Sequence, residues 1–262
     1  MATATQSHSI QAQRVRALIV PREHGAWGML LVPLATGASV GLLGNGRVFP
    51  LVLFMLLALA LFWLRTPLES LLGTSPMRAQ TENERRVVLQ AILWLASVAT
   101  LSLTALLWDA NSVQFLLFGA IGSVAFIGQA ILKQLGRNLR MSAQVLGALG
   151  LTASAPAAYF VMTRHLDTRA AALWLANWLF AGNQIHFVQL RIHASRAAGW
   201  KERFERGQIF LIGHCGMAAL LGFLVYYHFL PSLSVIAFVP VFFRGIAWFM
   251  QKPQPLAVRR LG

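Results

Sequence analysis

Polar side chains recur at helical spacing within an apolar stretch near residue 185. Gly182, His186, Gln189 and His193 follow one another at intervals of four, three and four residues. In a helix this spacing places all four on one face. Such a face could bind a polar headgroup or make ordinary interhelical hydrogen bonds, and both interpretations remain open. A shared metal ion is less favoured, because seven residues separate the two histidines by roughly 10.5 Å along a helix.

A second group of ionisable residues stands at the start of the first apolar run. Arg22, Glu23 and His24 are adjacent, and Trp27 follows one turn later. At a helix N-terminus such a group can present hydrogen-bond donors and the helix dipole to an anion. The alternative is a helix start with a tryptophan anchored at the membrane interface. We interpret the cluster as a candidate anion site at a membrane boundary.

Further cationic residues are expected near the same membrane face, at the ends of other apolar runs. The candidate substrate-binding residues are Arg22, Glu23, His24, Trp27, Arg65, Lys133, Arg137, Asn183, His186, Gln189, Arg191 and His193. Two more polar residues lie inside apolar runs, where His214 suits packing better than a site and Arg244 suits either. The residues assign no catalytic group.

The elements that must position these residues are transmembrane helices. Hydrophobic residues make up 57% of the 262 residues, charged residues make up 11%, and the apolar residues form long runs. A helix needs about 20 apolar residues to span a bilayer and satisfies its own backbone hydrogen bonds. Eight windows fit, near 24–44, 49–65, 87–108, 113–132, 142–162, 170–190, 208–228 and 232–250. The sequence therefore predicts an all-α polytopic membrane bundle of about eight transmembrane helices.

The basic residues predict the orientation of this bundle. Eighteen of the 22 Lys and Arg residues fall in the tails and alternate loops on one side, and three fall in the opposite loops. The positive-inside rule then places both termini in the cytoplasm and the protein in the cytoplasmic membrane as a multi-pass protein. The net charge of +14 thus predicts contact with anionic membrane lipids rather than with nucleic acid.

Three segments follow from this division. We expect a flexible basic cytoplasmic tail over residues 1–20, a transmembrane helical domain over residues 21–251, and a second basic cytoplasmic tail over residues 252–262.

Two families resemble this chain. The HGAW segment, His24 to Trp27, is typical of the YwiC-like family of bacterial membrane proteins, and this resemblance covers most of the chain. More distantly, the layout resembles the UbiA-type intramembrane prenyltransferases. The segments that carry this second likeness are Arg22 with Trp27 and Pro33, then Lys133, Arg137, Gln144, Gly147 and Pro156, then Trp174 to Asn183. That resemblance implies a UbiA-like helix arrangement with a site under the cytoplasmic loops after helices two and six.

The chain departs from the UbiA-type pattern at its metal site. Those enzymes hold Mg²⁺ and a prenyl diphosphate with two aspartate-rich motifs, whereas the only aspartates here are Asp109 and Asp167, both in predicted outer loops. Mg²⁺ is therefore not supported, no cofactor is predicted, and a diphosphate would be held by Arg and Lys alone.

Three functions fit the sequence. The favoured hypothesis is a divergent UbiA-like protein that binds or transfers an isoprenoid-type or other amphipathic lipid at a cationic pocket facing the cytoplasm. A small-molecule transporter is the first alternative, although no Asp or Glu is expected at midplane depth. An accessory or assembly subunit that works through helix packing is the second.

Overall fold

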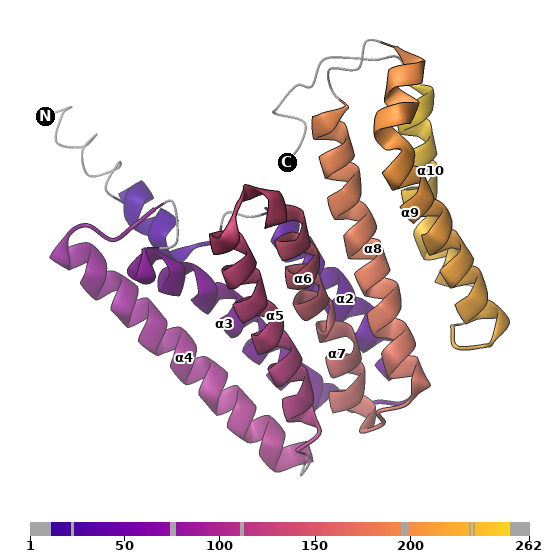
Figure 1. The fold of residues 1–262 in the computed structure, drawn as a ribbon. Helices are drawn as coiled ribbons and strands as arrows, with labels where there is room; N and C mark the ends of the chain where they lie inside the picture. The colour runs from indigo at the N-terminus through magenta and orange to yellow at the C-terminus, as the bar shows by residue number, and fades with distance from the viewer. Residues whose placement is uncertain are drawn as a thin grey trace, which may run out of the picture.

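The computed structural model describes residues 12–21, 24–73, 77–110, 113–194, 199–230, 232 and 234–251. All regular structure in these ranges is helical (Figure 1). The helices are α2 (His24–Leu43), α3 (Val48–Leu72), α4 (Glu82–Ala110), α5 (Phe115–Leu135), α6 (Arg140–Thr152), α7 (Ser154–Thr163), α8 (Thr168–His193), α9 (Trp200–Tyr226) and α10 (Ser234–Met250), with a 3₁₀ turn, η1, over Arg137–Leu139. The predicted all-α class is confirmed.

Among the described residues, six helical stretches are long and apolar enough to cross a membrane. Their bounds are Gly25–Leu43, Val48–Leu72, Glu82–Asp109, Phe115–Leu135, Met141–Thr163 and Trp200–Tyr226. By the same measure α8 is long enough but more polar, and α10 is shorter. Leu93, Trp94 and Trp108 of α4 are more than two-thirds exposed, as expected for side chains that lipid covers. The helices match the eight predicted windows in position, and six of those windows meet this criterion for a span.

One span contains a break, between α6 and α7 at Ala153. Pro156 has no N–H to donate to the carbonyl of Thr152 four residues earlier, so α6 ends there. Beside the break, the Thr152 hydroxyl donates to the Ala148 carbonyl at 2.8 Å. The Ser154 hydroxyl reaches the Leu30 carbonyl of α2 at 3.3 Å. The residues at the break are buried, and the Ser154 hydroxyl ties it to α2.

Glycines allow α2 and α7 to pack closely. A Cβ on Gly37 would overlap the backbone carbonyl of Ala155, and a Cβ on Gly41 would lie 2.7 Å from the Met162 sulfur. Glycines four residues apart give this kind of close helix contact in membranes, where van der Waals packing drives helix association. The largest buried apolar cluster surrounds this contact and extends to α3, α4 and α5.

Residues 12–19 form a helix that packs on the bundle, which differs from the tail predicted over residues 1–20. Leu18 is fully buried, and its carbonyl accepts a hydrogen bond from the Ser70 hydroxyl at 3.3 Å. Arg14 forms an ion pair of 2.6 Å with Glu84. Apolar burial and this ion pair hold the segment to α3 and α4. Residues 1–11 and 252–262 lie outside the described ranges.

The connections between helices gather at two ends of the bundle (Figure 1). We call the end that contains residues 65–73, 77–86, 133–140, 191–194 and 199–206 the basic end. The opposite end contains residues 44–47 and 163–168. In Figure 1, α8 lies between α6 and α7 on one side and α9 and α10 on the other, and it contacts all four of these helices.

Candidate functional site

A groove of about 240 Å³ lies between α6, α8 and α9. Its lining residues are Met141 and Val145 from α6, Trp178, Leu179, Gly182, Asn183 and His186 from α8, and Gly213 and Met217 from α9. Most of this lining is apolar, and its few polar side chains come from α8. A mainly apolar hollow with a small number of polar groups is the usual form of a small-molecule site.

Two tryptophans of α8 hold α6 at the wall of the groove. Trp174 Nε1 donates to the Leu149 carbonyl at 3.0 Å, and Trp178 Nε1 donates to the Val145 carbonyl at 3.4 Å. An indole has one donor, and in an apolar interior that donor must find a partner. These bonds therefore fix both the indole rings and the spacing of α6 from α8.

The polar groups of the groove connect α8 with α9. Asn183 Nδ2 lies 2.9 Å from Nδ1 of the buried His214. The His186 ring stands edge-on to Phe210, with ring centroids 5.9 Å apart. A Cβ on Gly213 would lie 3.6 Å from His186 Nδ1, an ordinary contact distance, so α9 packs directly beside the imidazole.

The structure extends the predicted polar face of α8 from the groove toward the basic end. Gly182 and His186 line the groove, and one turn further Gln189 Nε2 donates to Gln144 Oε1 of α6 at 3.4 Å. His193 Nδ1 lies 2.8 Å from the Gln189 carbonyl. Within the described ranges, no three His, Cys, Asp or Glu side chains are grouped as a metal site.

Arg191 is separated from this face. At 100° per residue it lies about 180° around α8 from Gly182, and it is not among the residues that line the groove. It follows Phe187, on which Arg244 of α10 packs, by one turn of α8.

The remaining predicted residues lie outside the groove. Trp27 packs edge-on against Phe62 of α3, with centroids 4.8 Å apart. Arg65 forms an ion pair of 2.9 Å with Glu69. Lys133 is exposed at the end of α5. Trp27 thus belongs to the contact between α2 and α3, whereas the ion pair of Arg65 lies within α3.

Four predicted positions are described partly or not at all. Arg22 and Glu23 lie outside the described residues. His24 begins α2 and Arg137 begins η1, and for these two the structure describes the backbone alone.

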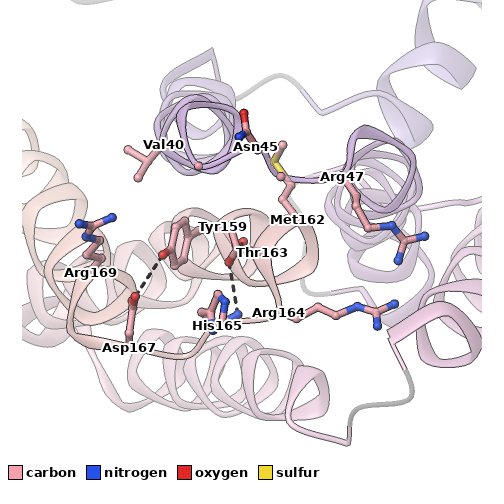
Figure 2. A pocket seen from close by; sticks show the side chains of 12 residues that line it. Val40, Asn45, Arg47, Tyr159, Met162, Thr163, Arg164, His165, Asp167 and Arg169 are labelled. Atoms are coloured by element: carbon pink, nitrogen blue, oxygen red, sulfur yellow. Dashed lines mark hydrogen bonds between the residues drawn. The ribbon is translucent and has the colours of Figure 1, made fainter.

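A second hollow, of about 630 Å³, lies at the opposite end (Figure 2). It is lined by Val40, Gly44, Asn45, Gly46, Arg47, Tyr159, Met162, Thr163, Arg164, His165, Asp167 and Arg169. The Tyr159 hydroxyl lies 3.1 Å from Asp167 Oδ2, and Asp167 Oδ1 accepts from the Ala170 N–H at the start of α8.

The other charged residues of this hollow form ion pairs that link the connections between helices. Arg47 forms a bidentate ion pair with Asp109 of α4, at 2.6 and 2.9 Å. Arg164 reaches the same carboxylate at 3.4 Å and also bonds the Asp109 carbonyl. One carboxylate thus joins three connections. Sequence reasoning missed this hollow because its lining comes from separate connections that only the helix arrangement brings together.

A family model for YwiC-like proteins matches residues 20–159, which is over half of the chain. The protein belongs to the YwiC-like family. The match begins just before α2 and ends within α7, so it includes the HGAW segment that predicted this family. In this YwiC-like protein α6 lies within the matched range, whereas α8 and α9 lie beyond it. No curated protein and no solved structure matches the chain.

Proposed function

We propose that this YwiC-like protein binds an amphipathic lipid with an isoprenoid-type tail in the groove between α6, α8 and α9. The observation that carries the proposal is the division of the groove: its lining is mostly apolar, and its polar residues on α8 are continued by Gln189 toward the basic end.

The apolar part suits a branched hydrocarbon tail. Met141, Val145, Trp178 and Met217 offer thioether, branched and aromatic surfaces, and methionine adapts to irregular apolar shapes. The volume of about 240 Å³ is below the roughly 300–1,000 Å³ of typical ligand sites. The groove would therefore hold one segment of a tail, with the remainder of the tail in the surrounding lipid.

The polar part suits an uncharged or anionic headgroup. Asn183, His186 and Gln189 supply amide and imidazole groups along about two turns of α8. Gln144 faces Gln189 from α6, so a headgroup there would meet amides from two helices. Such amides can both donate and accept hydrogen bonds.

We also propose that the basic end faces the cytoplasm, in the cytoplasmic membrane, as the charge asymmetry predicts. Single cysteines at Lys133 and Arg169, each in a Cys215→Ser background, mark the two ends. A membrane-impermeant maleimide added to intact cells should label the cysteine at residue 169 and should label that at residue 133 only after lysis. The reverse pattern would contradict this orientation.

The ligand class is tested by extracting and identifying the lipids that co-purify with gently solubilised protein. One equivalent of an isoprenoid, quinone or polyprenyl phosphate would support the proposal and identify the class. Bulk phospholipid alone, in the proportions of the membrane, would contradict it. The relation to UbiA-type enzymes stays a prediction.

A second candidate function is transport, which the break at Ala153 favours. Discontinuous helices near the midplane form the substrate sites of many transporters. Here the break lies between the hollow at one end of the bundle and the groove nearer the other. Flux of a candidate solute into proteoliposomes, lost when Gly182 is replaced by leucine, would favour transport over lipid binding.

A further inference from the structure

Arg244 is held against α8 although it stands in the apolar sequence of α10. Its guanidinium carbon lies 4.2 Å from the centroid of the Phe187 ring, and its Nη2 donates to Gln184 Oε1. A cation over an aromatic face is worth about 0.5–2 kcal/mol, more where water is excluded. These two contacts fix the guanidinium on α8, so it does not extend freely.

Arg191 lies on the same side of α8 as the two residues that Arg244 contacts, and we call this side the stripe. Gln184, Phe187 and Arg191 follow at spacings of three and four residues, which places them on one face. The Arg244 guanidinium contacts Gln184 and Phe187, and Arg191 follows Phe187 by one turn of α8, so the two like charges lie on the same surface and repel each other. Neither forms an ion pair with an acidic residue in the described part of the chain, and the sequences of α8 and α10 contain no Asp or Glu. A bound anion would relieve this repulsion.

The surroundings indicate which anion fits. Val188 and Ile192 beside the stripe are 40% and 47% exposed, and Phe243 beside Arg244 is 73% exposed. In a membrane protein such apolar exposure faces lipid. The contacts with Gln184 and Phe187 hold the Arg244 guanidinium about one turn of α8 from Arg191, which lies two residues before the end of that helix. Guanidinium groups bind phosphate oxygens through paired N–H donors.

We propose that Arg191 and Arg244 bind the phosphate of an anionic membrane lipid on the outer surface of α8 and α10. The stripe lies on the side of α8 away from Gly182 and His186, so this site is separate from the groove. Its lipid would join α10 to the bundle by bridging two helices that each supply one cation.

The test is native mass spectrometry of delipidated protein titrated with phosphatidylglycerol, and separately with phosphatidylcholine. The variant is Arg191→Gln with Arg244→Gln. Its matched control is Arg86→Gln, which removes an exposed charge on α4 at the same end. We expect the double variant to bind the first phosphatidylglycerol at least about tenfold more weakly, since it loses two charge-assisted contacts. The control should match the wild type.

Equal affinity in the double variant and the wild type would overturn the proposal, as would equal binding of the two lipids. Inorganic phosphate forms a third arm. If it binds with variant-sensitive affinity and displaces phosphatidylglycerol, the site serves a soluble phosphate and the lipid assignment fails. Should the glutamine variant not fold, Arg191→Lys with Arg244→Lys keeps both charges but loses the paired donors, and an intermediate affinity is expected. Gly182→Leu should leave this site intact, which separates it from the groove.

Discussion

Asn183 of α8 and His214 of α9 form a side-chain pair in the helical interior, with Nδ2 and Nδ1 2.9 Å apart. His214 is 5% exposed, so no solvent replaces this bond if Asn183 is lost. The pair therefore joins α9 to α8 at the level of the groove.

Replacing Asn183 with alanine should destabilise the protein by about 1–3 kcal/mol, because a buried imidazole nitrogen loses its partner. Gln134→Ala, at an exposed position of α5, is the control and should be nearly neutral. Thermal unfolding in detergent measures both. A melting temperature equal to that of the wild type would show that the pair does not hold α8 to α9.

Gly37 should not accept a side chain. Gly37→Ala places a Cβ into the carbonyl of Ala155, and α2 must move away from α7, with a cost of roughly 1–3 kcal/mol or more. Gly28→Ala in the same helix meets nothing within 4 Å and should be neutral or slightly stabilising. Size-exclusion profiles after stepwise heating compare the two variants. Equal stability of the two would contradict the close packing of α2 and α7.

The ion pairs of Asp109 should contribute modestly. Asp109→Asn weakens the contacts to both Arg47 and Arg164, whose side chains are nearly half exposed, so a loss of about 1 kcal/mol is expected. Salt should reduce the difference from the wild type. Glu82→Gln is the comparison, because its pair with Arg86 is about 70% exposed on both sides and should contribute nothing measurable. A larger loss for Glu82→Gln would overturn this ranking.

The sequence predicts the helices well because the backbone of a segment within lipid must form its own hydrogen bonds. A span must satisfy its own hydrogen bonds, so a long apolar run becomes a helix whatever its neighbours are. The break at Ala153 could also be anticipated from Pro156, although the expected window ran through it. The docking of residues 12–19 could not, because it depends on Glu84 and Ser70, which lie more than 50 residues away.

The candidate site was predicted in part. Helical periodicity placed Gly182, His186, Gln189 and His193 on one face, and in the structure these four follow one line from the groove toward the basic end. The same periodicity places Arg191 on the opposite side of α8. The predicted site included Arg191 with this face because both lie near the same side of the membrane. The partners supplied by α6 and α9 could not be predicted, because sequence spacing does not determine how helices are arranged around one another.

The most direct test of the lipid-binding groove fills it. A Cβ on Gly182 meets nothing within 4 Å and residue 182 lines the groove, so Gly182→Leu should place its side chain in the groove. Gly216→Leu adds the same side chain to the exposed side of α9, also in open space, and serves as the control. Native mass spectrometry of the three gently purified proteins should show one tightly bound amphipathic lipid on the wild type and on Gly216→Leu, and its loss from Gly182→Leu. Equal retention of that lipid by Gly182→Leu would contradict binding in the groove.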